Sequence, residues 1–189
     1  MTTSIDIANS ALVLLGGREI TSFTDHSNEA TVAKNLYRSA RDFVLRAYPW
    51  ASLKKRANVV ELAEKPVSGF EHQYQLPGDS VRVLEVHSGG KYRVDHWEVN
   101  GRAVLTDSKP ISIVYISDTV PEQNYSTQLV QALTYRLAAE MAYPVTGSNQ
   151  AQVNFNSLFQ NVLDEARTTD ALEQSAKHIG PSNFQRVRL

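Results

Sequence analysis

A long amphipathic helical pattern stops at Ala47-Tyr48-Pro49, and the chain leaves through Trp50 into an alternating, basic segment. Proline has no amide hydrogen and a fixed φ, and it disfavours the helical conformation of the residue before it. We therefore predict that a helix ends at this point and that a sheet begins after it. The same three residue types recur at 142–144, where we expect a second helix to end.

Four segments of the chain have apolar residues at helical spacing. The expected helices are Ser4 to Leu15, Asn28 to Ala47, Ser126 to Pro144, and Ser148 to Leu172. The first two lie before the alternating segment and the last two after it. We predict a four-helix bundle formed by two helical pairs, made of residues 1–49 and 119–174.

Between the helical pairs the apolar period falls to about two, and Val, Ile and Tyr become frequent, as is typical of strands. The expected strands are Leu53 to Glu61, Glu71 to Leu76, Val81 to Val86, Tyr92 to Val99, Ala103 to Leu105, and Ile111 to Ile116. Turn residues separate them, and Asn100-Gly101 is the most specific hairpin signal. The sequence predicts an α+β fold in which residues 50–118 form an inserted small antiparallel β domain, arranged as a meander.

Composition limits the classes of protein that the chain can belong to. The 189 residues contain 19 basic and 20 acidic side chains, so the molecule as a whole has no bulk attraction for polyanions. The absence of cysteine excludes disulfides and thiolate metal sites. The longest apolar run, Ala11 to Leu15, is far shorter than the roughly 20 residues that span a bilayer. We expect a globular protein that is made in the cytoplasm and does not enter a membrane.

The sequence contains little that indicates catalysis. If the protein were a glycoside hydrolase, Glu61 and Glu64 would be its pair of catalytic carboxylates. We expect them, however, where a strand ends and a polar turn begins. No two histidines lie four residues apart on an expected helix, and no metal-binding motif occurs. Gly89-Gly90-Lys91 lacks the spacing of a phosphate loop and predicts a hairpin turn. We expect no catalytic residue, no metal and no cofactor.

A run of three cations, Lys54-Lys55-Arg56, follows Trp50. On a strand, Lys54 and Arg56 share one face and Lys55 lies on the other. One interpretation is an edge strand protected by charge; the other is a contact with DNA phosphates or with a neighbouring subunit. In a ring of many copies the three charges repeat and form a basic collar.

The C-terminal segment 175–189 is basic and partly apolar, without an acidic residue. Such a segment cannot bury itself locally, so it is either frayed or an extended arm that becomes ordered on a partner. The residues that we expect to contact the partner are Phe184, Arg186, Val187, Arg188 and Leu189.

Several blocks of the sequence, taken in order, resemble one family. The blocks are YRSARDFVLRAYPWASLKKRANV, YQLPGDSVRVLEV, WEVNGRAVLTD, ISIVYI and LVQALTYRLAAEMAYPVTGS. They are similar to the tail tubular protein A family of short-tailed phages, whose members are head-to-tail adaptors, also called gatekeepers. The similarity extends over about residues 30–148.

This resemblance implies a structural virion protein rather than an enzyme. It implies a homo-oligomeric ring, expected to be a 12-mer, that lies under the portal protein, closes the DNA exit channel and provides the attachment platform for the tail nozzle protein, which is tail tubular protein B-like. The helical part and the C-terminal arm would face the portal, and residues 50–118 would face the nozzle. A location in the tail or neck of the virion follows from the same resemblance. In such a ring the basic collar would line a DNA channel and make non-specific contact with packaged DNA.

Two rival functions stay open at this point. A tail-associated peptidoglycan hydrolase would use Glu61 and Glu64, and a free, sequence-independent DNA-binding module would use Lys54, Lys55 and Arg56. Loss of peptidoglycan cleavage in Glu61→Gln would favour the first, and salt-dependent DNA binding by a monomer would favour the second.

Overall fold

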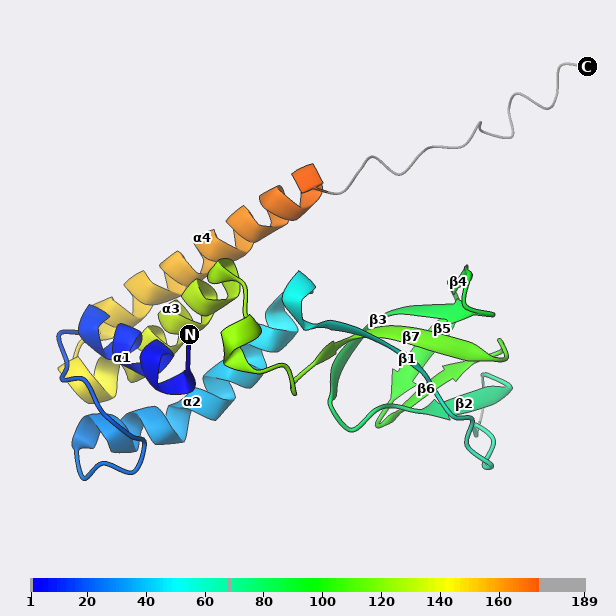
Figure 1. The fold of residues 1–189 in the computed structure, drawn as a ribbon, viewed down its shortest axis with the longest axis horizontal. Coiled ribbons are helices and arrows are strands. Elements are labelled where there is room, and N and C mark those ends of the chain that lie inside the picture. The colour runs from blue at the N-terminus through cyan, green and yellow to red at the C-terminus, as the bar shows by residue number, and fades with distance from the viewer. Residues whose placement is uncertain (1, 68, 174–189) are drawn as a thin grey trace, which may run out of the picture.

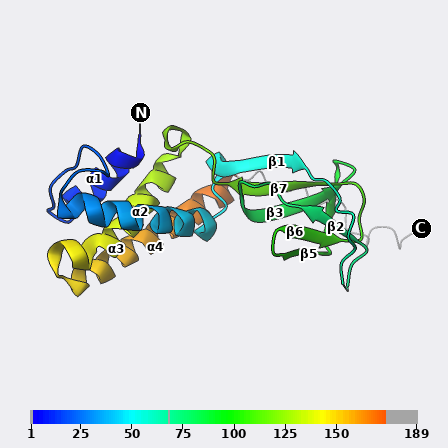
Figure 2. The ribbon, with the colours of Figure 1, turned by 90° about the horizontal axis from the view of Figure 1, so that it is seen from below.

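The part of the chain that the structure describes has an α+β fold, as predicted, with four α-helices and two antiparallel sheets (Figure 1). The structure, a computed structural model, describes residues 2–67 and 69–173. The helices gather at one end of the molecule and the strands at the other, and two chain segments connect these parts (Figures 1 and 2).

The helical part is organised around α3 (Thr127–Thr146), which packs against α1 (Ser4–Leu14), α2 (Asn28–Ala47) and α4 (Asn149–Glu173). Side-chain oxygens accept hydrogen bonds from free amides at three helix starts, where Thr3, Ser27 and Ser126 are the N-caps. Alanines at the contacts allow the helix axes to approach closely. Those buried on α2 and α3 are Ala30, Ala33, Ala40, Ala132, Ala138, Ala139 and Ala142.

The two Ala-Tyr-Pro sequences do not behave alike. α2 ends at Ala47, as expected, and Tyr48 before the proline is extended, with φ −143° and ψ 147°. α3 continues through Pro144 to Thr146, so the prediction that it ends at Tyr143-Pro144 is wrong. A proline removes one backbone hydrogen bond but does not prevent the last helical turn from being completed by other groups.

Two residues after Pro144 complete that turn. Thr146 donates its hydroxyl to the carbonyl of Ala142 at 2.6 Å, and the amide of Gly147 donates to the carbonyl of Tyr143 at 2.8 Å. Gly147 has a φ of +70°, the left-handed conformation that commonly ends helices. The glycine, and not the proline, therefore ends α3.

The strands form two sheets and not the predicted meander. The seven strands are β1 (Lys54–Asn58), β2 (His72–Gln75), β3 (Ser80–Ser88), β4 (Tyr92–Val94), β5 (Trp97–Asn100), β6 (Ala103–Thr106) and β7 (Ile111–Ser117). One sheet has the order β1-β7-β3-β4 and the other β2-β6-β5. The expected single strand from Tyr92 to Val99 is divided into β4 and β5, which belong to different sheets.

The hairpin expected at Asn100-Gly101 joins β5 to β6, with its turn displaced by one residue. Asn100 pairs with Ala103, so the two-residue loop is Gly101-Arg102. Gly101 has a φ of +58° and Arg102 a negative one. Glycine at the first loop position fits a type II′ turn, whose twist matches that of the flanking strands.

Two apolar clusters support these two parts. One lies between the sheets and includes Tyr74 and Val104 from one sheet and Val86 and Tyr115 from the other. The second cluster is the core of the helical part, and it includes Ile116 from the end of β7. The four-stranded sheet therefore contributes to both cores.

Candidate functional site

The connection between the helices and the sheet is built on the C-terminal end of α2. The last four carbonyls of a helix lack partners within it. Two of them accept side-chain hydrogen bonds, from the Trp50 indole to Val44 at 2.8 Å and from Arg82 on β3 to Arg46 at 3.2 Å. The guanidinium also lies where the helix dipole favours a positive charge.

We use the term joint for Tyr48, Trp50, Leu53, Arg82 and Ile116. The four apolar or aromatic members are buried in the helical core cluster. The rings of Tyr48 and Trp50 meet edge to face, with centroids 4.9 Å apart, and the Tyr48 hydroxyl donates to the carbonyl of Ala166 on α4 at 3.1 Å. The joint thus fixes α2, α4 and the four-stranded sheet to one another.

The carboxylate of Asp79, the residue before β3, is the centre of a second set of polar contacts. It accepts hydrogen bonds from Ser117 at 2.7 Å, Lys55 at 3.0 Å, Thr119 at 3.0 Å and Tyr115 at 3.1 Å. Burial raises the pKa of Asp79, but these hydrogen bonds outweigh it and hold the pKa well below its usual range. We call these five residues the Asp79 cluster. Lys55 therefore forms an ion pair with Asp79 of the same chain.

Lys54 and Arg56 lie on the opposite face of β1 from Lys55, as the alternation predicts, and β1 is an edge strand. Directly paired residues in an antiparallel sheet point to the same side. Lys54 and Arg82 both pair with Ile116, one from each neighbouring strand. Lys54 and Arg82 therefore flank Ile116 on one face of the sheet.

The remaining rows extend this face toward the far end of the sheet. Arg56 and Glu85 both pair with Val114, and His87 pairs with Arg93 on β4. We call Lys54, Arg56, Arg82 and Arg93 the cationic face. Among residues 2–67 and 69–173, none of these four makes an ion pair with a carboxylate.

Arg82 and Arg93 were not singled out from the sequence. They join Lys54 and Arg56 because of the strand order and the register. Exposed guanidinium and ammonium groups spread over three strands attract phosphates without reading a base sequence. This face is the candidate site that geometry supports best.

Glu61, one of the two carboxylates of the hydrolase hypothesis, is held by two basic side chains. Glu61 accepts from Lys109 at 2.6 Å and contacts His72 Nδ1 at 2.7 Å. The Lys109 hydrogen bond, with that of His72, lowers the pKa of Glu61, whereas a general acid needs a raised pKa. The backbone carbonyl of Glu64 accepts from the Gln73 amide.

The part of the chain that the structure describes holds no group of three or more His, Asp or Glu side chains placed to bind a metal. Within the same residues, no helix is long and apolar enough to cross a membrane. The hairpin expected at Gly89-Gly90-Lys91 is present, with Ser88 paired to Tyr92 across it.

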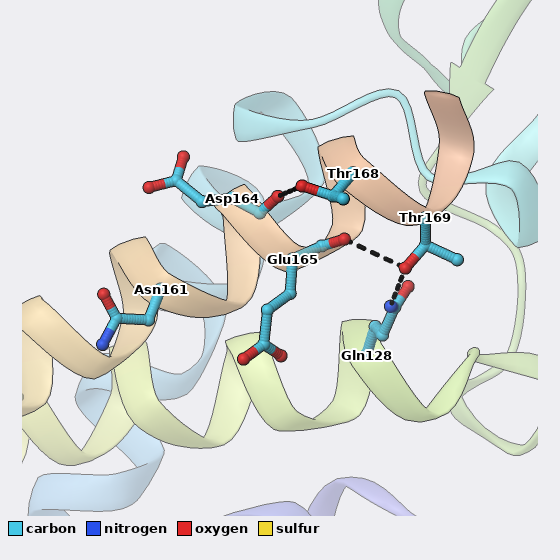
Figure 3. Close-up of a pocket in the computed structure, with 6 residues that line it drawn as sticks. All are labelled: Gln128, Asn161, Asp164, Glu165, Thr168 and Thr169. Carbon is cyan, nitrogen blue, oxygen red and sulfur yellow. Dashed lines mark hydrogen bonds between the residues drawn. The ribbon is translucent and has the colours of Figure 1, made fainter. Parts of the chain in front are cut away.

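A polar groove of about 540 Å³ lies between α3 and α4 (Figure 3). Gln128 donates to the hydroxyl of Thr169 at 3.4 Å, and that hydroxyl donates to the carbonyl of Glu165 at 3.0 Å. The carboxylates of Asp164 and Glu165 make no hydrogen bond to the other residues drawn in Figure 3. The residues that line the groove are amides, carboxylates and threonines.

The expected partner-binding residues Phe184, Arg186, Val187, Arg188 and Leu189 lie outside the described residues. The chain matches no protein-family model and no curated protein.

Proposed function

We propose that the chain is a structural head-to-tail adaptor of a short-tailed phage, which forms a ring under the portal, closes the DNA exit channel and carries the tail nozzle. The observation that carries the proposal is the similarity, block after block and in order, between residues 30–148 and the tail tubular protein A family.

The arrangement of the molecule supports this role. An adaptor has to transmit position from one partner to another, and a joint made of buried aromatic packing and capped helix carbonyls keeps two parts in a fixed relation. Fixed geometry between a portal-facing and a nozzle-facing part allows identical copies to close a ring.

Removal of the residues after Gly180 tests the proposal. We expect the shortened protein to keep its thermal unfolding profile and to lose about tenfold or more in affinity for its portal, because the arm supplies apolar and basic contacts. Binding to the purified portal is measured by interferometry, with the full chain as reference. Unchanged affinity would remove the arm from the proposal, and absence of portal binding by the full chain would overturn the adaptor function.

The cationic face favours a second function, sequence-independent contact with duplex DNA. We expect the triple variant Lys54→Ala/Arg56→Ala/Arg93→Ala to bind a short duplex about tenfold more weakly at low salt. The slope of log affinity against log salt should fall by about 3, roughly one unit for each lost phosphate contact. Fluorescence anisotropy measures both.

Lys34→Ala/Arg38→Ala/Lys65→Ala is the matched control, since it removes the same charge from exposed positions away from the cationic face. It should retain more affinity and a steeper salt slope than the first triple variant. Equal losses in the two variants would show that the face has no special part in DNA contact.

A further inference from the structure

A recess of about 280 Å³ opens beside the joint, between the end of α2, the start of β3 and the turn that joins β5 to β6. Three arginines from these elements, Arg46, Arg82 and Arg102, line it together with apolar residues that include Leu76 and Val99. Arg82 also belongs to the cationic face, whereas Arg46 and Arg102 belong neither to that face nor to the carboxylate pair of the hydrolase hypothesis.

Two of the arginines are positioned by backbone carbonyls. Arg102 donates to the carbonyls of Ser80 and Pro77, and Arg82 donates to the carbonyl of Arg46. Each guanidinium has five N–H donors, so most of them stay available. Within the described residues none of the three pairs with a carboxylate.

Three like charges around one recess repel one another, and an oxyanion placed among them relieves that repulsion. The planar guanidinium fork matches a carboxylate in a bidentate manner. The apolar lining also accommodates the methylene groups of an acidic side chain. The recess therefore suits the carboxylate of a protein side chain.

The chain itself carries an excess of such carboxylates in the segment that follows the β domain. Residues 119–173 contain two basic residues, Arg136 and Arg167, and the acidic residues Glu122, Glu140, Asp164, Glu165, Asp170 and Glu173. Asp164 pairs with Arg167, while Glu165 is exposed and has no ion pair among the described residues. A second copy can therefore supply the anion.

The two charged features lie at the same end of the helical part. Ala166, next to Glu165, accepts a hydrogen bond from Tyr48, which is two residues from Arg46. Two different complementary patches on one molecule make a heterologous contact, which on repetition forms a ring if its rotation closes and an open filament if it does not.

We propose that the Arg46–Arg82–Arg102 recess binds the acidic α4 surface around Glu165 of a second copy of this chain. The inference deepens the proposed ring assembly and rests on it. It assigns a role to Arg46, whose guanidinium makes no hydrogen bond or ion pair within the described residues.

Sedimentation velocity of the full chain over a hundredfold concentration range, at low and high salt, tests the contact. Arg46→Glu and Glu165→Lys are each expected to weaken self-association about tenfold, and the double variant is expected to restore most of the loss, because the swapped charges attract again. Arg38→Glu on the same helix is the matched control, since its side chain is 92% exposed and lies outside the recess, and it should change little.

Three results would overturn the inference. The first is a wild-type protein that stays monomeric at all concentrations. The second is a double variant that self-associates no more strongly than the single variants. The third is a loss of duplex DNA binding by Arg46→Glu as large as its loss of self-association. Portal binding by the full chain is measured separately, so a failure of this contact is distinguishable from a failure of the adaptor function.

Discussion

Trp50→Ala is expected to lower the free energy of unfolding by about 3–5 kcal/mol, the range for truncating a large buried aromatic residue. The Trp50 side chain is only 2% exposed and lies in the helical core. Its removal leaves a cavity beside Tyr48 and takes a donor from the carbonyl of Val44. Urea denaturation followed by circular dichroism measures the change.

Trp50→Phe separates the two contributions. Phenylalanine keeps most of the buried area but has no N–H to donate, so we expect a smaller loss of about 1–3 kcal/mol. If Trp50→Ala cost no more than a surface substitution, about 0.5 kcal/mol, the joint would not stabilise the fold.

The Ala-Tyr-Pro pattern correctly predicted the end of α2, next to the joint, but not the end of α3. Pro49 and the extended Tyr48 end α2 where the sequence predicts. At 142–144 the same three residues stay helical, because Thr146 and Gly147 donate hydrogen bonds to the carbonyls of Ala142 and Tyr143. The end of a helix thus depends also on the residues that follow the proline. A comparison limited to the three residues Ala-Tyr-Pro leaves those residues out.

The strands were predicted largely in the correct places, but their pairing was not. Period and turn residues are local properties, whereas β1 pairs with β7 across more than fifty residues of sequence. The register of β3 also shifts at a bulge between Val83 and Glu85. Neither feature has a local signal that fixes it.

The same limit applies to the candidate site. The alternation placed Lys54 and Arg56 on one face of a strand and Lys55 on the other, and the structure confirms this placement. That Arg93 belongs to the same face follows only from the order β1-β7-β3-β4. Asp79, the partner of Lys55, lies in an expected turn. Nothing in the sequence near it predicts the four side chains that donate hydrogen bonds to it.

Asp79→Ala is expected to lower the free energy of unfolding by about 3 kcal/mol at neutral pH. Hydrogen bonds to a charged group contribute roughly 1.5–3 kcal/mol each, but four that share one carboxylate do not add. The side chain is 18% exposed, and its loss also leaves Lys55 without its counter-ion. Asp95→Asn, at an exposed position, is the control and should stay within about 0.5 kcal/mol of wild type.

The pH dependence identifies the charge as the cause. The folded protein holds the pKa of Asp79 below that of an unfolded chain, because the hydrogen bonds to its carboxylate outweigh its burial. The stabilisation is therefore fully present above about pH 4, the ordinary range for aspartate, and is lost as the pH falls below it. The difference in unfolding free energy between wild type and Asp79→Asn should be constant from about pH 5 to 7 and shrink steadily below pH 4. A difference that stays constant down to pH 2 would mean that Asp79 stabilises the sheet by shape and not through its charge.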